Sequence, residues 1–542
     1  MFRVSSQSVS ENENSSGWLI PLGLLLLLAA ILRFVALARE PMINADGIVY
    51  ILQAKAFYLH LSDQLLSVYR YPTNISLMMA GLFHFTGDWI LSGRMISFFF
   101  SLLTIIPFYF MNLILWPRRI AVMVVALYVI SPVFTGLSFQ IIRGPEFWFF
   151  LVLGCWGFCS FLERKNPPAY LLSLVAAAFV LAAWSRIEGL LPLLLAFIWL
   201  LGDGRVRKMR YLTAYLLPVF LLLIITGGLL ISHSSVQFDP VKILTHGVGG
   251  RLFDSVERFR WLRETLSELG NNPPSGVAPG FFDEAHTLLW LLALGVTGHS
   301  IHKTFGNLFF LVTIFGFLRI GVGGFEKFRR TRSELFLLLL ILTGFFFIYI
   351  QIILNWSSSV RFVALIYFPA LIFSGYGFNR LFFYWRKMRP GSSQMLALTL
   401  FCLLVFLPSG YSILKKSHLS RAVVFKEIGL QLATRHPAGR EMNLGGTSSK
   451  IVFTHFYAMI DRSGITTPLK HCDVTRVDQL KLSMLQSGRY DYLLLSDRDG
   501  GRQHFLQLLE KVPDSGIAAI IEKQTEKYGW VTLFARLRPG RS

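Results

Sequence analysis

The chain has 542 residues, of which 54% are hydrophobic, and its formal net charge is +21 at pH 7. A positive charge of this size is often found in proteins that bind nucleic acid. However, the basic residues gather mostly in short joints between apolar segments, where they oppose translocation and meet anionic lipid. Composition therefore favours a membrane protein in contact with lipid and argues against nucleic-acid binding. The four cysteines show neither zinc-ligand spacing nor a disulfide framework.

Apolar segments follow one another from residue 18 to residue 414, and we expect about eleven transmembrane helices there. The first follows a polar tail, residues 1–17, and is expected to be retained because no small-residue cleavage site comes after it. Further spans are expected at residues 93–115, two within 119–163, two within 169–202, and one each at 211–232, 302–320, 334–354, 361–380 and 393–413.

The joints between these spans are alternately basic and nearly uncharged, as in the basic Trp116-Pro-Arg-Arg119. Basic short loops stay in the cytoplasm, which predicts an inner (plasma) membrane protein with a cytoplasmic N-terminus. Loops 38–92 and 233–286 are then extracytoplasmic. Since the number of spans is odd, residues 415–542, whose composition is that of a soluble domain, are also outside. We expect a mainly α membrane domain over 18–414 and an extracytoplasmic α/β domain over 415–542.

Outside the spans, several shorter elements are expected. The first loop predicts an amphipathic helix over 48–61 and a second helical piece over 72–85. The second long loop predicts a polar helix over 254–269, followed by an interfacial helix over 286–299. In the tail we expect helices over 423–436, 450–459 and 478–487, and strands over 490–496 and 529–537.

The hairpin at 169–202 is short for a pair of spans, because a helix rises only about 1.5 Å per residue against a core of about 30 Å. Its tip carries Arg186 and Glu188, which are therefore expected below the outer surface. Charged groups at such depth need partners and usually mark a site, although these two could also simply pair with each other.

Asp46 stands in the first outer loop, just before the expected amphipathic helix. A carboxylate there suits a general base that takes a proton from an acceptor hydroxyl or amine. The alternative is an N-cap for the helix beginning near residue 48, because Asp is a favoured cap. The two roles remain compatible if Asn44 is the cap.

The arginines at the outer ends of spans are suited to bind a phosphate group, because the N–H donors of a guanidinium group are spaced to reach two phosphate oxygens at once. Arg143 and Glu146 flank Gly144-Pro145 at a span break, where they could instead form a pair that caps the hairpin. Arg361 and Arg94 stand at span boundaries, where an arginine is often a snorkelling anchor. Arg33, near the outer end of the first span, is also expected to snorkel.

In order and topology, these segments resemble the polytopic glycosyltransferases of the C type. The likeness is to the branch of protein O-mannosyltransferases, lipid A aminoarabinose transferases and rhizobial-type lipopolysaccharide sugar transferases. It covers residues 20–200 and 340–410 and rests on five pieces: Asn44-Ala-Asp-Gly-Ile-Val-Tyr50, Arg70-Tyr-Pro72, Gly93-Arg94-Met-Ile-Ser97, Leu181-Ala-Ala-Trp-Ser-Arg-Ile-Glu-Gly-Leu190 and Arg361-Phe-Val-Ala-Leu-Ile-Tyr-Phe-Pro369.

The resemblance implies an extracytoplasmic site that moves a sugar, with inversion, from a polyprenyl-phosphate donor to a lipid, glycan or protein acceptor. It assigns Asp46 as base and Glu146 as a second acidic residue. Contacts to the donor phosphate would come from Arg143, Arg361, Arg186 and Arg94, with Glu188 and Tyr50 in support. No cofactor is required by this chemistry, and a divalent metal is possible. Lipopolysaccharide or protein glycosylation is the expected setting.

Two positions depart from the family pattern, and they keep alternatives open. Asp46 is followed by Gly47, where many members have a second acidic residue, and Gly144 stands before Pro145, where many have Asp. These departures support a non-catalytic assembly factor for surface polysaccharide. A transporter or flippase would explain intramembrane charge, but it predicts repeated halves, which the sequence does not show. No phosphate-binding Gly-Lys-Ser/Thr loop, zincin helix or nucleophile elbow is present, which disfavours ATP hydrolysis and serine-type acyl transfer.

Overall fold

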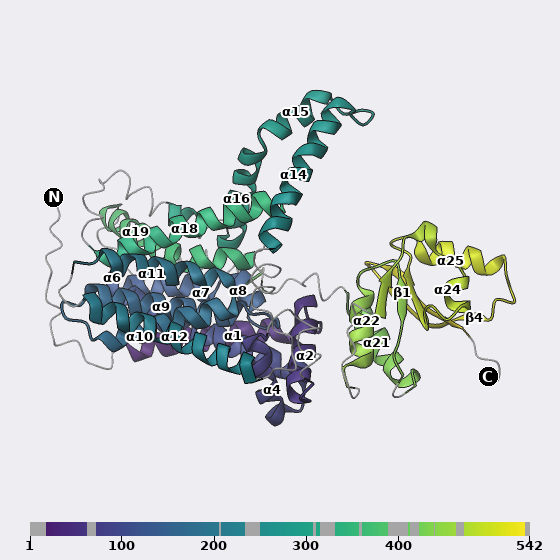
Figure 1. Cartoon of the computed structure of the whole chain (residues 1–542), viewed down its shortest axis with the longest axis horizontal. Coiled ribbons are helices and arrows are strands. Elements are labelled where there is room, and N and C mark those ends of the chain that lie inside the picture. The colour runs from purple at the N-terminus through teal and green to yellow at the C-terminus, as the bar shows by residue number, and fades with distance from the viewer. Residues whose placement is uncertain are drawn as a thin grey trace. The chain divides into compact units, whose positions relative to one another are not determined.

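A computed structural model describes residues 18–61, 72–204, 208–232, 250–306, 310–314, 331–356, 360–388, 410–411, 413, 422–437, 440–461 and 471–536 (Figure 1). Internal contacts divide the chain into two units. The transmembrane unit comprises Met1–Phe34, Met95–Phe139 and Arg143–Leu414. The sheet-containing unit comprises Val35–Arg94, Gln140–Ile142 and Lys415–Ser542, so that the first loop belongs with the tail.

The transmembrane unit consists mainly of apolar helices around one continuous hydrophobic core, and its helix at residues 250–271 is polar, as the sequence predicted. Its elements in chain order are most of α1 (Leu19–Ala38), most of α5 (Trp89–Leu103), α6 (Ile105–Leu115), α7 (Arg118–Val129), α8 (Pro132–Leu137), α9 (Gly144–Glu163), α10 (Ala169–Ser185), the 3-10 turn η1 (Ile187–Gly189), α11 (Leu190–Gly202), α12 (Lys208–Ser232), α14 (Gly250–Asn271), α15 (Pro279–Thr287), α16 (Leu289–Phe305), α18 (Arg332–Asn355) and α19 (Val360–Met388). The last turn of α1 and the first residues of α5, up to Arg94, belong to the sheet-containing unit.

Among the described residues, five segments are long and apolar enough to cross a membrane: Leu19–Ala38, Trp89–Leu115, Gly144–Glu163, Arg332–Asn355 and Val360–Leu381. Helices that are apolar on all sides are stable only in lipid or inside a large core. The chain is therefore a membrane protein, as predicted. The number eleven stays a prediction, because nearly all of the expected span at 393–413 and almost half of that at 302–320 lie outside the described residues.

The break expected between residues 299 and 302 is wrong. One helix, α16, runs through both positions and ends at Phe305. Gly306 follows it with a φ of 75°, the left-handed region that stops a helix and favours glycine. The helix continues through Ser300 and Lys303 because the segment contains neither proline nor another helix-breaking residue there.

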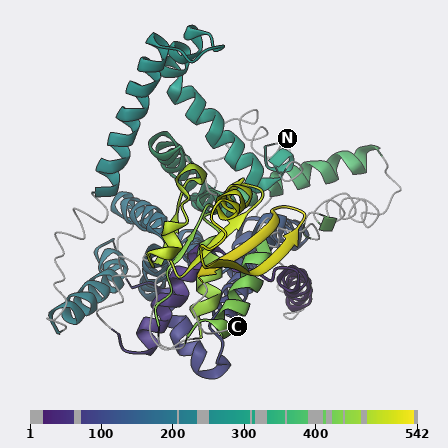
Figure 2. The same ribbon diagram turned by 90° about the vertical axis from the view of Figure 1, so that its right-hand side faces the viewer.

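The sheet-containing unit combines two first-loop helices with a mixed sheet. Helices α2 (Ala45–Tyr58) and α4 (Asn74–Thr86) pack on each other, as α21 (Val423–Arg435) and α22 (Ile451–Met459) do. The sheet has the order β2-β1-β3-β5-β4. Its strands, visible in Figure 2, are β1 (Leu444–Gly446), β2 (Cys472–Val474), β3 (Tyr492–Ser496), β4 (Ile517–Thr525) and β5 (Gly529–Arg536).

Strand β1 runs parallel to its neighbours β2 and β3, whereas β5 is antiparallel to the central strand β3 and to β4. The register pairs Leu444 with Tyr492 and Leu493 with Phe534. The expected helix over 478–487 is wrong. That segment forms a 3-10 turn, Val477–Gln479, and the short helix α24, Ser483–Gln486, because Leu480 adopts an extended backbone between them. Helix α25 (Gly501–Glu510) and the strands β1, β2 and β4 were not expected.

Candidate functional site

The hairpin tip is folded tightly back on helix α10. Arg186 has an extended backbone, and its N–H donates to the carbonyl of Ala182 at 2.8 Å. A Cβ added at Gly189 would lie 2.3 Å from the backbone nitrogen of Ala183, which real structures do not tolerate. Glycine at this position is thus a packing requirement of the turn. The two legs have 17 and 13 residues, so they are about 25 and 20 Å long, as short as the sequence predicted.

Arg186 and Glu188 form a buried ion pair at this tip. Nη2 of Arg186 lies 2.7 Å from Oε1 of Glu188, and the two side chains are only 11% and 3% exposed. Nε donates to Oε2 at 3.4 Å, which makes the contact two-pronged. The guanidinium also lies over the rings of Phe147, at 5.9 Å, and Phe362, at 4.7 Å. The local pairing considered from the sequence is therefore present, and it fixes the direction of Arg186.

Glu146 is buried beside the same tip. It stands in the first turn of α9, is 2% exposed, and shares a side-chain hydrogen bond with Ser185, the residue before Arg186. Arg143 lies close enough to attract its charge. Within the described residues, Oε2 of Glu146 has no hydrogen-bond partner. A buried carboxylate oxygen without a partner carries a desolvation cost, which is common where a ligand or water completes a site.

Three chain breaks therefore meet in the transmembrane unit. The start of α9 brings Arg143 and Glu146, the hairpin tip brings the Arg186–Glu188 pair, and α19 contacts that tip. Arg361 is the second residue of α19 and directly precedes Phe362, whose ring covers Arg186. Four of the residues predicted for the site thus come together, and Arg361 stands next in the chain to the ring that covers Arg186, although the sequence separates it from Arg143 by more than 200 positions.

Arg33 does not snorkel. It is fully buried in the bundle, where its Nε donates to Oγ of Ser101 at 2.5 Å and its Nη1 donates to the carbonyl of Ala29 at 3.3 Å. Its guanidinium lies 5.3 Å from the ring centre of Tyr128. The expectation was wrong because α5 and α7 provide polar and aromatic partners inside the bundle, which the sequence of α1 cannot reveal.

Asp46 belongs to the sheet-containing unit, and it is not the helix cap. Helix α2 begins at Ala45, so Asn44 occupies the N-cap position and Asp46 lies half-buried in the first turn. The Asn44 amide does not cap the helix either. It donates to the carbonyl of Ile141 at 3.2 Å and accepts from the N–H of Ile141 at 3.0 Å. A carboxylate in the first turn, such as that of Asp46, is favoured by the helix dipole.

The glycine that follows Asp46 has a steric reason. A Cβ at Gly47 would lie 3.1 Å from both the Cβ of Ile141 and Oδ1 of Asn44. A Cβ at Gly93 would approach the same Ile141 side chain to 2.9 Å. Ile141 is therefore wedged between the start of α2 and α5, and the departure from an acidic pair at residues 46 and 47 reflects this packing.

Arg94 and Tyr50 hold the first loop together. Nη2 of Arg94 donates to the carbonyls of Glu40 and Met42, at 2.8 and 2.7 Å. Tyr50 is buried, and its carbonyl accepts a hydrogen bond from Ser76 at 3.0 Å. These contacts give both residues a positioning function within the sheet-containing unit. Their expected contact with the donor stays a prediction.

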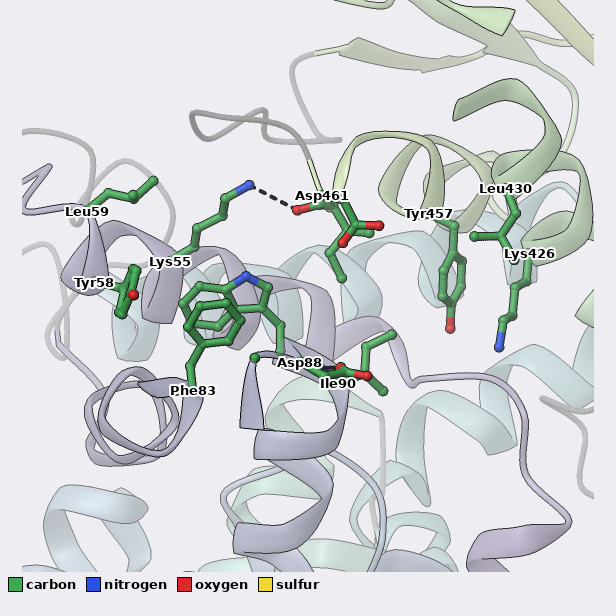
Figure 3. A pocket seen from close by; sticks show the side chains of 13 residues that line it. Lys55, Tyr58, Leu59, Phe83, Asp88, Ile90, Lys426, Leu430, Tyr457 and Asp461 are labelled. Carbon is green, nitrogen blue, oxygen red and sulfur yellow. Dashed lines mark hydrogen bonds between the residues drawn. The ribbon is translucent and has the colours of Figure 1, made fainter. Parts of the chain in front are cut away.

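A cavity that the sequence did not reveal opens inside the sheet-containing unit (Figure 3). It measures about 760 Å³ and lies between first-loop residues 55–90 and tail residues 426–461. Aromatic side chains form part of its wall, with Tyr58, Phe83 and Trp89 in mutual ring contact. No spacing could have indicated this cavity, because its two sides come from segments more than 300 residues apart.

Two lysines reach the cavity from opposite sides. Lys55, buried on α2, donates to the carbonyl of Ile460 at 3.0 Å, and Lys426 on α21 donates to that of Pro41 at 3.0 Å. Burial lowers the pKa of Lys55, an effect that the negative charge of Asp461 opposes. Burial likewise lowers the pKa of Lys426. Both ammonium groups are thus partly desolvated, which strengthens any hydrogen bond that they donate.

The described residues do not form a metal centre. They contain no group of three or more His, Cys, Asp or Glu placed to hold an ion. In the hairpin cluster, Glu188 is already paired with Arg186, which leaves one unpartnered carboxylate oxygen on Glu146. Hard divalent cations need several oxygen ligands, so these residues do not fit a metal, and we derive no step through one.

Comparison of the sequence with known proteins gives no match, either to a family model or to a curated protein. The structure, in contrast, resembles the oligosaccharyltransferase of Archaeoglobus fulgidus. The structure of that enzyme with zinc and sulfate gives a TM-score of 0.53 at 12% identity, covering 96% of this chain and 74% of that one. The structure with a tethered acceptor peptide containing the NVT sequon gives 0.50 at 11% identity, covering 97% and 74%.

A third solved structure, ArnT of Cupriavidus metallidurans bound to undecaprenyl phosphate, gives a lower TM-score of 0.46 at 12% identity, covering 98% of this chain and 100% of that one. At these identities, the likeness to the oligosaccharyltransferase establishes the fold. The resemblance to polytopic glycosyltransferases of the C type, which the sequence motifs indicate, is thereby confirmed at the level of the fold.

Proposed function

We propose that this membrane protein transfers a sugar from a polyprenyl-phosphate donor to an acceptor on the extracytoplasmic side of the membrane. The observation that carries the proposal is the hairpin cluster of the transmembrane unit, in which two buried carboxylates and their arginines meet. The proposal is also supported by the fold that this chain shares with an oligosaccharyltransferase. Since fold alone does not fix function, the proposal assigns the transfer chemistry to individual residues.

The reaction needs no nucleotide, because the glycosyl phosphate bond of the donor already supplies the driving force. A base takes the proton of the acceptor hydroxyl or amine while that atom attacks the anomeric carbon. The bond from the anomeric carbon to the phosphate oxygen breaks, and the electron pair leaves on the polyprenyl phosphate. The enzyme must therefore orient both substrates, accept one proton and stabilise the phosphate charge.

We assign the proton acceptor to Asp46, whose carboxylate is half-buried in the first turn of α2 and does not cap that helix. Glu146 is the second acidic candidate. For the donor phosphate we propose Arg143 and Arg361, both half-buried at span ends. Arg186 is held by Glu188, so we expect it to orient or screen the phosphate as part of this pair.

The proposed setting is the inner membrane, with the N-terminus in the cytoplasm and residues 415–542 outside. This orientation follows from the basic joints between the spans. An inverting reaction and a polyprenyl carrier are carried over from the family resemblance. The comparison enzyme was solved with zinc. The transfer assay is therefore run both with added divalent metal and with a chelator.

Membranes containing the protein would be supplied with radiolabelled polyprenyl-phosphate sugars and native lipid, glycan and protein acceptors. The wild type is expected to transfer label, and Asp46→Asn to lose at least about a hundredfold in rate, as expected for loss of a general base. Asp514→Asn, a change at an exposed tail residue, is the matched control. Full transfer by Asp46→Asn, at equal expression, would remove Asp46 from the base role and direct attention to Glu146.

A further inference from the structure

We propose that the cavity of the sheet-containing unit binds a short oligosaccharide, which identifies the acceptor of the transfer reaction as a glycan chain. This inference rests on the proposed function and adds the class of the acceptor. The cavity measures about 760 Å³, within the range of about 300–1,000 Å³ that ligand sites occupy. It is thus large enough for several polar contacts to one ligand.

The charges around the cavity are balanced on each side. The first loop contributes Lys55 and Asp88, and the tail contributes Lys426 and Asp461 (Figure 3). Each side therefore offers an ammonium donor and a carboxylate acceptor. The two aspartates offset the attraction of the two lysines for a phosphate or another anion, so the cavity does not select an anion. A sugar hydroxyl both donates and accepts hydrogen bonds, so it satisfies both kinds of group at once.

Aromatic rings complete the chemistry of a saccharide site. Phe83 and Trp89 are stacked, with centroids 3.7 Å apart, and Tyr58 meets both rings edge-on. Such a rigid aromatic wall offers an apolar surface to the C–H face of a pyranose ring at little entropic cost. Tyr457 adds a polar hydroxyl from α22, and this hydroxyl accepts a hydrogen bond from the N–H of Ile43 at 3.3 Å.

The lining also weighs against a lipid or peptide occupant. An acyl chain would have to lie against four charged side chains, which costs desolvation without new hydrogen bonds. An extended peptide needs a strand edge or a row of backbone partners, whereas the cavity is walled by helices α2, α4, α21 and α22 and by the start of α5.

The cavity lies away from the proposed base. Lys55 follows Asp46 by nine residues on α2, about 14 Å along the helix axis and half a turn around it. A saccharide bound at Lys55 is therefore a remote part of the acceptor and not the reacting sugar. Its contacts contribute equally to substrate and transition state, so their loss should raise KM and leave kcat unchanged.

The test measures binding of oligosaccharides to the full chain in nanodiscs by saturation-transfer NMR and calorimetry. The probes are neutral oligosaccharides released by mild acid from the surface glycans of the organism that makes the protein. The variants are Tyr58→Leu and Asp461→Asn. Their matched controls are Tyr170→Leu and Asp514→Asn, at exposed positions outside the cavity. Thermal melting reports whether each variant is folded, and Asp461→Asn changes an exposed residue conservatively.

We expect the wild type to bind, both cavity variants to bind at least about fivefold more weakly, and both controls to bind as the wild type does. Three results would overturn the inference. The cavity variants could bind as tightly as the wild type, the wild type could fail to bind, or a lipid or peptide could displace the sugar. Because binding does not require transfer, a protein that binds glycan but transfers no sugar would refute the proposed function alone.

Discussion

The buried pair at the hairpin tip gives the sharpest test of the transmembrane site. Changing Glu188→Gln removes one charge but leaves the guanidinium of Arg186 in a position where it is only 11% exposed. Removing one partner of a buried ion pair costs about 3–5 kcal/mol, because the remaining charge is uncompensated. We expect this loss to be reduced, but not abolished, by the rings of Phe147 and Phe362 that face the guanidinium.

The assay is unfolding in mixed SDS and neutral-detergent micelles, followed by tryptophan fluorescence. Glu427→Gln is the matched control, since Glu427 is 48% exposed in a pair with Lys523 and should lose less than about 1 kcal/mol. The double change Arg186→Met with Glu188→Leu should regain most of the stability, because apolar residues of similar volume can replace a buried pair.

Sugar transfer separates the two roles of this pair. If Arg186 screens the donor phosphate, the stable double variant should still transfer sugar at least about tenfold more slowly than the wild type. If the pair only closes the turn, activity should return with stability. An effect of Glu188→Gln no larger than that of Glu427→Gln would refute the burial argument itself.

Two further predictions concern packing and pH. Gly189→Ala should lower thermal stability by about 3 kcal/mol or more, because its Cβ would meet backbone atoms at 2.3 Å, whereas Gly202→Ala, with open space around it, should be neutral in the same melting assay. Burial, with His471 nearby, lowers the pKa of His455 from 6.5 to about 4, so the folded tail favours the neutral ring. The free energy of unfolding is therefore at its full value above pH 6.5. It falls by up to about 3 kcal/mol as the pH drops toward 4, because in this range the unfolded chain binds a proton at His455 and the folded chain does not. Hydrogen exchange in α22, measured against pH, should show this loss of stability in the wild type. The variant His455→Gln, which keeps a donor for the Met442 carbonyl, should show a smaller dependence on pH. An identical pH dependence in both proteins would contradict the role given to His455.

Much of the membrane architecture was predictable from the sequence. Apolar runs and charged joints marked α1, α9, α18 and α19, because helix formation in lipid depends on local hydrophobicity alone. The short hairpin and its Arg186–Glu188 tip were visible for the same reason. The breaks at 143–146 and 185–189 were placed correctly because proline and glycine act on their own backbone.

Predictions from local sequence patterns were wrong where distant segments of the chain determine the environment of a residue. The sequence of α1 suggested that Arg33 reaches the membrane surface, but Ser101 and Tyr128 provide partners inside the bundle. The glycine after Asp46 looked like a lost acidic residue, whereas it makes room for Ile141. The strands β1 and β2 have only three residues each, too few for any alternation to appear.

The sequence by itself thus determined a membrane protein, indicated a fold like that of the polytopic glycosyltransferases of the C type, and named the charged residues at the breaks between its helices. Only the tertiary structure decided which of these residues meet. Glu146 stands in α9, Arg186 directly follows α10, and Phe362, whose ring covers Arg186, stands in α19. The packing of these helices depends on the whole core, and the cavity joins the first loop to the tail. Hydrophobicity is a property of each segment, but a site depends on contacts between segments, which no single segment encodes.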